Sequence, residues 1–166
     1  MGRFVVYPDP ALTRAAVVRP VDDAMRAAGE NLLAAAAEVK AYGLAAAHIG
    51  MIEPLVVISV SDDPQQRDYL VMFNPEVTAF ADETAFGPEA SVSMPGIEAP
   101  IERAVWCEIA FDDAEGIRST RRFEGFVARC AFHEIDQMNG VFFLNRLSRL
   151  KRETAIRKFQ KLNRAG

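Results

Sequence analysis

Residues 133–140, His-Glu-Ile-Asp-Gln-Met-Asn-Gly, follow a segment, residues 126–132, that is apolar at nearly every position. A helix that is apolar on all sides belongs in the interior of a protein, so this segment predicts a buried helix. The ionisable side chains of His133 and Glu134 would then lie in a dry environment, where burial is costly unless partners satisfy them. Gln137 falls one helical turn after His133 on the same face. The remaining elements are therefore expected to surround this helix.

The residues that begin at His133 are close to the zinc-hydrolase motif H-E-x-x-H. In that motif both histidines bind the metal and the glutamate acts on the bound water. Here the position of the second histidine is Gln137. The helix thus offers one imidazole and one candidate general base, Glu134, but only an amide where the second metal ligand would be.

The composition indicates a single domain, residues 1–166, without a DNA or membrane partner. The formal net charge is −4 and the pI is about 5.3, which argues against nucleic-acid binding. No apolar run approaches membrane-spanning length, and Pro8 interrupts the N-terminal segment before a signal-peptide core could form. We therefore expect a cytoplasmic protein. Cys107 and Cys130 are expected to be buried thiols, since two cysteines do not make a disulfide framework.

Strand patterns fill the middle of the chain, and helix patterns lie on both sides of them. Helices are expected at residues 21–41, where apolar residues recur every three or four positions, and at residues 148–163. Strands are expected at residues 55–60, 69–73, 76–80, 104–111 and 117–123, and a short segment that ends in a turn at residues 89–96. This order favours an α+β fold, with the helix of His133 surrounded by antiparallel strands and with N-terminal and C-terminal helices.

Three segments carry a family resemblance. They are residues 41–50, Ala-Tyr-Gly-Leu-Ala-Ala-Ala-His-Ile-Gly; residues 89–96, Glu-Ala-Ser-Val-Ser-Met-Pro-Gly; and residues 133–137, His-Glu-Ile-Asp-Gln. In order and spacing they resemble the peptide deformylase motifs G-x-G-L-A-A-x-Q-x-G, E-G-C-L-S-x-P-G and H-E-x-D-H, and the likeness covers essentially the whole chain. The resemblance implies the deformylase fold. It also implies the family reaction, which is metal-dependent hydrolytic removal of the formyl group from N-formylmethionyl peptides.

In that family the cysteine and both histidines hold a divalent metal, the glutamate moves the proton, and the glutamine helps to polarise the formyl oxygen. Carried over, His133 matches a metal ligand and Glu134 matches the general base. Ser91 replaces the cysteine, Gln137 replaces the second histidine, and His48 replaces the glutamine. A hydroxyl and an amide are poor ligands beside thiolate and imidazole. We therefore expect the family reaction to be lost or strongly reduced, and the cofactor to be none or a weakly bound divalent metal such as iron, zinc or nickel.

A different set of residues could still hold a metal. His48 and His133 could converge on the pocket and bind an ion together with Ser91 or Glu134, because two imidazoles suit zinc, nickel or copper. In the simpler alternative, His48 forms a hydrogen bond with Gln137 or Ser91 and no metal binds.

Two further arrangements could rebuild the site. Cys130, one turn before His133, could supply a thiolate, although its helix position is expected to point into the core. Ser91, a histidine and Glu134 have the residue types of a nucleophilic triad, although the sequence supplies no strained turn to activate the serine. A hydrolase with a site rebuilt around His48, Ser91, His133 and Glu134 is therefore an alternative function.

The resemblance also indicates a groove for a peptide. It places the methionine pocket between the first motif and the metal helix. The substrate-binding candidates are Tyr42, Gly43, Leu44, Val92 and Ser93. Tyr42 stands where the family usually has a small aliphatic residue and is expected to narrow the pocket. The implied partner is the N-terminal peptide of a nascent chain.

The C-terminal helix is basic, with a single acid, Glu153, between residues 148 and 163. The usual explanation is a solvated face over an apolar stripe. In bacterial deformylases a C-terminal helix can dock on the ribosome, and a basic face suits an anionic partner. A non-catalytic peptide-binding or ribosome-binding module is thus a further alternative.

Overall fold

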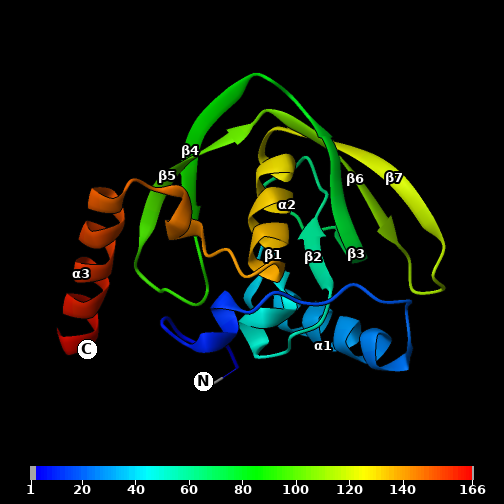
Figure 1. Ribbon diagram of the computed structural model, residues 1–166, viewed down its shortest axis with the longest axis horizontal. Helices are drawn as coiled ribbons and strands as arrows, with labels where there is room; N and C mark the ends of the chain where they lie inside the picture. Colours follow the sequence, from blue (N-terminus) through cyan, green and yellow to red (C-terminus); the bar gives the residue numbers. More distant parts are fainter. Residues whose placement is uncertain (1–2, 166) are drawn as a thin grey trace.

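The structure, a computed structural model, describes residues 3–165 (Figure 1). The α-helices are α1 (Asp23–Val39), α2 (Gly125–Met138) and α3 (Arg149–Ala165). Short 3₁₀ helices are η1 (Pro10–Thr13), η2 (Ala46–Ile49) and η3 (Phe143–Arg146). The strands are β1 (Gly43–Ala45), β2 (Leu55–Ser59), β3 (Tyr69–Phe80), β4 (Thr84–Ala90), β5 (Glu98–Ala104), β6 (Trp106–Asp112) and β7 (Arg118–Glu124). No helix within residues 3–165 has both the length and the apolar character needed to cross a membrane.

The strands form two antiparallel sheets. A five-stranded sheet has the order β1-β2-β3-β6-β7, and β4 pairs with β5 in a separate hairpin. Helix α2 lies between this hairpin and the large sheet, and contacts strands of both (Figure 1). The expected α+β fold, with the helix of His133 among antiparallel strands, is confirmed.

Strand β2 shows why the large sheet carries a helix on each face. Its five residues are all buried, as expected for a strand covered on both sides. Because side chains alternate between the two faces of a strand, Val56 and Ile58 pack into the core cluster of α2. Leu55 and Val57 pack into the core cluster of α1. Strand β1 pairs with β2 and also contacts α2.

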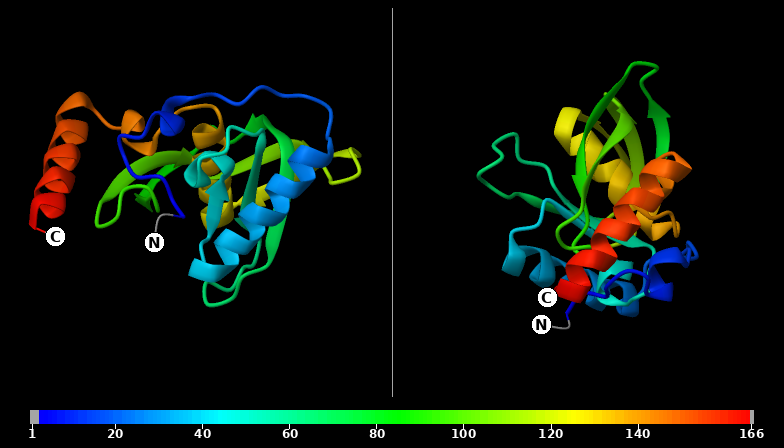
Figure 2. Two further views of the ribbon diagram at one scale, coloured as in Figure 1. Left: turned by 90° about the horizontal axis from the view of Figure 1, so that it is seen from below. Right: turned by 90° about the vertical axis from the view of Figure 1, so that its left-hand side faces the viewer.

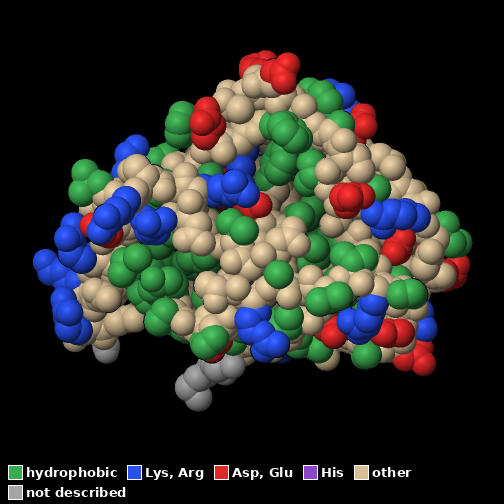
Figure 3. All heavy atoms as spheres, in the orientation of Figure 1, with side chains coloured by type: hydrophobic (Ala, Val, Ile, Leu, Met, Phe, Trp, Pro, Cys, Tyr) green, Lys and Arg blue, Asp and Glu red, His purple; other side chains and the backbone are tan. Residues whose placement is uncertain are grey.

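Helix α3 stands at one end of the molecule, next to the hairpin and far from α1 (Figure 2). It is anchored through Phe159, which is buried in a third core cluster with residues from η1, β5 and η3. Most of its other side chains are exposed, and Lys and Arg side chains gather over it at the left edge of Figure 3.

The strands at residues 69–73 and 76–80 are parts of one strand, β3, with an irregularity between Phe73 and Glu76. Asn74 adopts a positive φ of 50° there, and its side-chain amide donates to the Arg19 carbonyl and to Asp112. Pro75 has no N–H to donate to a ladder, and a bulge is where a sheet tolerates it.

The hairpin of β4 and β5 was not expected from the sequence, where residues 89–96 indicate only a short segment before a turn. Pro88 and Pro100 lie opposite each other in its register. Prolines lower the expectation of a strand, but a two-stranded hairpin tolerates them because each strand is an edge. The three-residue strand β1 was also not expected, since its residues are mostly small.

Candidate functional site

A cavity of about 500 Å³ lies between α2, β1 and the end of β4. Most of the site residues expected from the sequence line it: Tyr42, Gly43, Leu44, His48, Ser91, Val92, His133 and Glu134. Ser93 is not among the lining residues. Its side chain is fully buried, its N–H donates to Ser91 Oγ, and its carbonyl accepts from the N–H of Tyr7. The expected role of Ser93 in contacting a ligand therefore has no support from its position.

His133 is oriented by Glu89 at the end of β4. The His133 Nδ1–H donates to Glu89 Oε1 at 2.8 Å, which leaves Nε2 as the ring nitrogen that faces the site. Burial alone would raise the pKa of Glu89, but hydrogen bonds from Arg103 and His133 outweigh it and lower that pKa to about 2. Glu89 therefore stays ionised and holds the imidazole in one orientation.

Arg103 completes this support, and sequence analysis assigned no role to it or to Glu89. Its guanidinium donates two hydrogen bonds to Glu89, both of 2.9 Å, and one to Asp136 at 2.7 Å. Arg129 adds a further bond to Glu89 at 2.9 Å. Glu89 begins the second motif quoted above, and Asp136 belongs to the third, so two motifs carry the sequence signal for this network.

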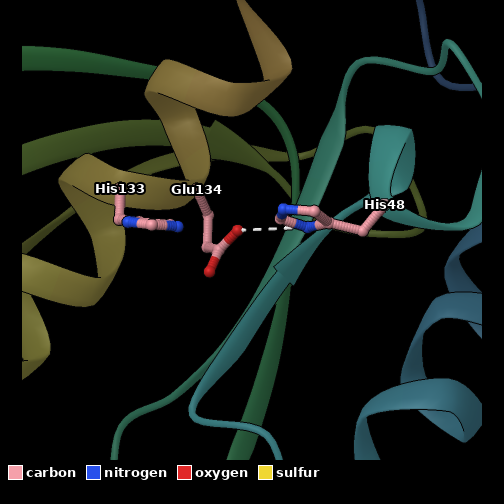
Figure 4. A group of neighbouring side chains, drawn as sticks. All are labelled: His48, His133 and Glu134. Atoms are coloured by element: carbon pink, nitrogen blue, oxygen red, sulfur yellow. Dashed lines mark ion pairs between the residues drawn. The ribbon is translucent and has the colours of Figure 1, made fainter. Parts of the chain in front are cut away.

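Glu134 lies between the two imidazoles (Figure 4). Burial raises the pKa of Glu134 to about 7, and the charge of Glu89 adds to this effect. Burial would lower the pKa of His133, but the charge of Glu134 and the bond to Glu89 raise it. Oε1 of Glu134 is buried and has no hydrogen-bond partner among the described residues. Its neighbour is His48 Nδ1, at 3.6 Å.

The tautomer of His48 follows from a backbone contact. Nδ1 accepts the N–H of Ala45 at 3.0 Å, so the neutral ring carries its proton on Nε2. Burial lowers the pKa of His48 to about 3, which keeps the ring neutral. Nε2 lies 3.5 Å from Ser91 Oγ. Because this nitrogen already holds a proton, it cannot accept one from Ser91, and the tautomer does not suit a nucleophilic triad with Glu134.

Ser91 and Gln137, which the resemblance places at two ligand positions, do not suit a metal. Ser91 offers a neutral hydroxyl that already accepts the N–H of Ser93 at 3.1 Å. The Gln137 side chain donates to the Leu12 carbonyl at 2.7 Å instead of contacting His48, and it does not line the cavity. Of the three residues that the resemblance places at ligand positions, only His133 suits such an ion.

Another set of donors does converge. One ligand atom each from His48, His133 and Glu134 lies within 4.8 Å of the other two, and all three residues are buried. Cys130 is outside this cluster, and burial raises the pKa of its thiol to about 12. The expectation that Cys130 points away into the core needs correction, because it is half-buried and lines the cavity while it also packs against the core of α2.

Tyr42 stands at the edge of the cavity. Its ring packs edge-on against Phe126 with centroids 4.9 Å apart, and the Arg67 guanidinium lies 3.8 Å from its centroid. Its hydroxyl donates to the Pro64 carbonyl at 3.0 Å. A second cavity of about 240 Å³ has Tyr42 and Phe126 in its wall. Tyr42 is thus held in place by three contacts where the two cavities approach each other.

Comparisons with known proteins identify the family and the fold. A peptide deformylase-like protein of Rhizobium meliloti (strain 1021) is 39% identical over 163 residues, which cover 98% of this chain and 93% of that protein. A peptide deformylase of the same strain is 33% identical over 159 residues, or 95% and 91% of the two chains. The crystal structure of peptide deformylase from Ehrlichia chaffeensis superposes with a TM-score of 0.89 at 27% identity, and covers 98% of this chain and 96% of that one. The profile of the family described as polypeptide deformylase matches residues 1–153, and this chain belongs to that family.

Proposed function

We propose that this protein keeps the peptide groove of the deformylases and has lost, or strongly reduced, their metal-dependent removal of the formyl group. The proposal rests on Gln137, whose side-chain N–H donates a hydrogen bond to the Leu12 carbonyl. In the family this position holds a metal-binding imidazole. Ser91, in place of the cysteine, gives the site a neutral hydroxyl. In the family, the metal supplies an acidified water. Ser91 and Gln137 would not hold an ion there.

The rest of the groove suits a peptide end. Apolar side chains of Leu44, Val92 and Phe126 line the cavity, which is the environment that an unbranched apolar residue such as methionine prefers. The cavity also presents Glu134 and the His48–Ser91 pair as polar groups that can orient a peptide. We therefore propose the N-terminal peptide of a nascent chain as the ligand.

The test of lost catalysis is repair. The double variant Ser91→Cys/Gln137→His and the wild type are each loaded with iron, nickel or zinc and assayed for release of formate from a formyl-Met peptide. We expect the repaired protein to be faster by at least about 100-fold, since even loss of an outer-shell partner of a metal costs about 10–100-fold. Ser91→Ala/Gln137→Met is the matched control and should stay at the wild-type rate. Wild-type turnover equal to that of the repaired protein would overturn the proposal.

The test of ligand binding uses the unmodified protein. Calorimetric titration with formylated and unformylated Met peptides should give measurable affinity, and Phe126→Ala should weaken it because that ring forms part of the cavity wall. If neither peptide binds, the proposed peptide ligand is refuted. In that case a hydrolase with a rebuilt site would be assayed with a panel of esters and amides.

A contact between α3 and the ribosome is a second candidate. Arg157 and Lys158 are exposed and Arg152 is half-buried on this helix, which carries the basic surface of Figure 3. Replacing all three with Gln should reduce co-sedimentation with ribosomes at low salt, because this contact would be electrostatic. Unchanged co-sedimentation would refute this role.

A further inference from the structure

We propose that His48, His133 and Glu134 form a divalent-metal site with a ligand set different from that of the family. Of the family ligand positions this site uses only His133. It adds His48 and recruits Glu134, which the resemblance assigns to proton transfer, as a ligand. The three ligand atoms already lie within 4.8 Å of one another in the buried wall of the cavity. The proposal concerns binding of an ion and is independent of whether the protein turns over formyl peptides.

The distance between His48 and Glu134 supports a shared ion. Nδ1 and Oε1 are 3.6 Å apart, which is beyond the usual hydrogen-bond length of about 2.7–3.2 Å. Two donors that each lie about 2.1 Å from one tetrahedral ion would be about 3.4 Å apart. The two atoms are therefore close to the spacing that coordination requires. Oε1 also has no hydrogen-bond partner among the described residues, and an ion would satisfy it.

Both imidazoles have a tautomer that suits coordination. Glu89 accepts the Nδ1–H of His133, as carboxylates commonly do for metal-bound histidines, and leaves Nε2 for the ion. In His48 the proton lies on Nε2, next to Ser91, and the lone pair of Nδ1 now accepts the N–H of Ala45. Coordination at Nδ1 would require the ion to displace this N–H.

The donor set indicates the class of ion. Two imidazole nitrogens and one carboxylate oxygen suit zinc, nickel, copper or iron, whereas magnesium and calcium prefer oxygen ligands. Coordination would also engage Glu134, so that this residue would no longer be free to act as a general base. Such a site could hold an ion in a protein that does not deformylate peptides.

Calorimetric titration of untagged, chelator-treated protein with Zn²⁺ tests the site, and the visible spectrum of the Co²⁺ complex reports the ligands. We expect one ion per chain. Glu134→Gln and His48→Gln should each weaken binding by at least about 100-fold and change the Co²⁺ spectrum. Gln137→Met is the matched control and should change the affinity by less than about threefold, because the Gln137 side chain bonds to Leu12 and does not line the cavity. Ser91→Ala removes the 3.5 Å contact to His48 Nε2 and should weaken binding by about 10-fold at most, less than the loss of a ligand. Loss of His133 weakens binding in either arrangement and serves as the positive control.

The outcomes separate this site from the family site. In a family-type site Ser91 and Gln137 are ligands, so their replacement would weaken binding and Glu134→Gln would not. That pattern would overturn the proposal, as would absence of Zn²⁺ and Co²⁺ binding to the wild type. Thermal unfolding of each metal-free variant shows whether that variant is folded. Glu134→Gln is expected to remain folded, because the change replaces a buried carboxylate that has an unsatisfied oxygen. Formyl-peptide turnover is measured separately, so a failure of the proposed function is not confused with a failure of this site.

Discussion

Replacing Arg103 with Met should strongly destabilise the protein. The Arg103 side chain is 6% exposed and donates two hydrogen bonds to Glu89 and one to Asp136. Methionine has a similar length but no charge, so the change leaves a buried carboxylate with fewer partners. Breaking a buried ion pair by removing one partner costs about 3–5 kcal/mol of unfolding free energy.

The geometry places the expected loss near the lower end of that range. Three hydrogen bonds to charged groups, at about 1.5–3 kcal/mol each, would sum to about 5–9 kcal/mol. Glu89 keeps its bonds to Arg129 and His133, and the methionine side chain restores part of the packing. We therefore expect a loss of about 3 kcal/mol for Arg103→Met.

Urea unfolding followed by the fluorescence of Trp106, the single tryptophan, measures this loss as a change in midpoint at constant slope. Arg146→Met is the matched control, because Arg146 bonds to the same Asp136 but its side chain is 48% exposed. An exposed ion pair contributes only about 0–1 kcal/mol. A loss below about 1 kcal/mol for Arg103→Met, or an equal loss for Arg146→Met, would contradict the importance of burial.

Other regions of the structure yield three further predictions. The pKa of Glu89 is lowered to about 2, so ionised Glu89 stabilises the folded protein fully above about pH 5, and this stabilisation is lost as the pH falls toward 2. Glu89→Gln should flatten this pH dependence of the unfolding free energy, measured by urea unfolding at a series of pH values. In Gly43→Ala, the new Cβ would lie 3.0 Å from Oε2 of Glu134, so the unfolding free energy should fall by about 1–3 kcal/mol. An unchanged unfolding free energy would mean that the Glu134 side chain can move away freely. Cys107 is fully buried and burial raises its pKa to about 12, so Ellman's reagent should modify it at least about 1000-fold more slowly in the native protein than in denaturant.

Sequence patterns predicted the large elements of the fold because their signals are local. Strand β2 is a continuous apolar run, and α2 carries an apolar segment next to His133. The hairpin of β4 and β5 was missed because Pro88 and Pro100 contradict a strand locally, while their pairing depends on contacts across the hairpin.

The candidate site was predictable to the extent that motifs carried it. Spacing and resemblance brought His48, Ser91 and His133 to one cavity, as the structure also does. The partner of His133 could not be derived, because it lies 44 residues away in the chain and no local pattern links the two. The same holds for Gln137, whose partner Leu12 lies 125 residues away. The hydrogen-bond partners of a buried polar group depend on the tertiary fold, so the partners of His133 and Gln137 are seen only in the structure.

The bond from Gln137 to Leu12 has a consequence for how this protein can change over evolution. The resemblance assigns position 137 to a metal-binding histidine, whereas here the Gln137 side chain joins the central helix to the N-terminal segment through its bond to Leu12. A histidine at 137 carries two ring nitrogens, so one can donate its N–H to the Leu12 carbonyl while the other faces an ion, as in the arrangement of His133 with Glu89. A return to histidine would therefore cost at most about 1 kcal/mol, the value of this one hydrogen bond.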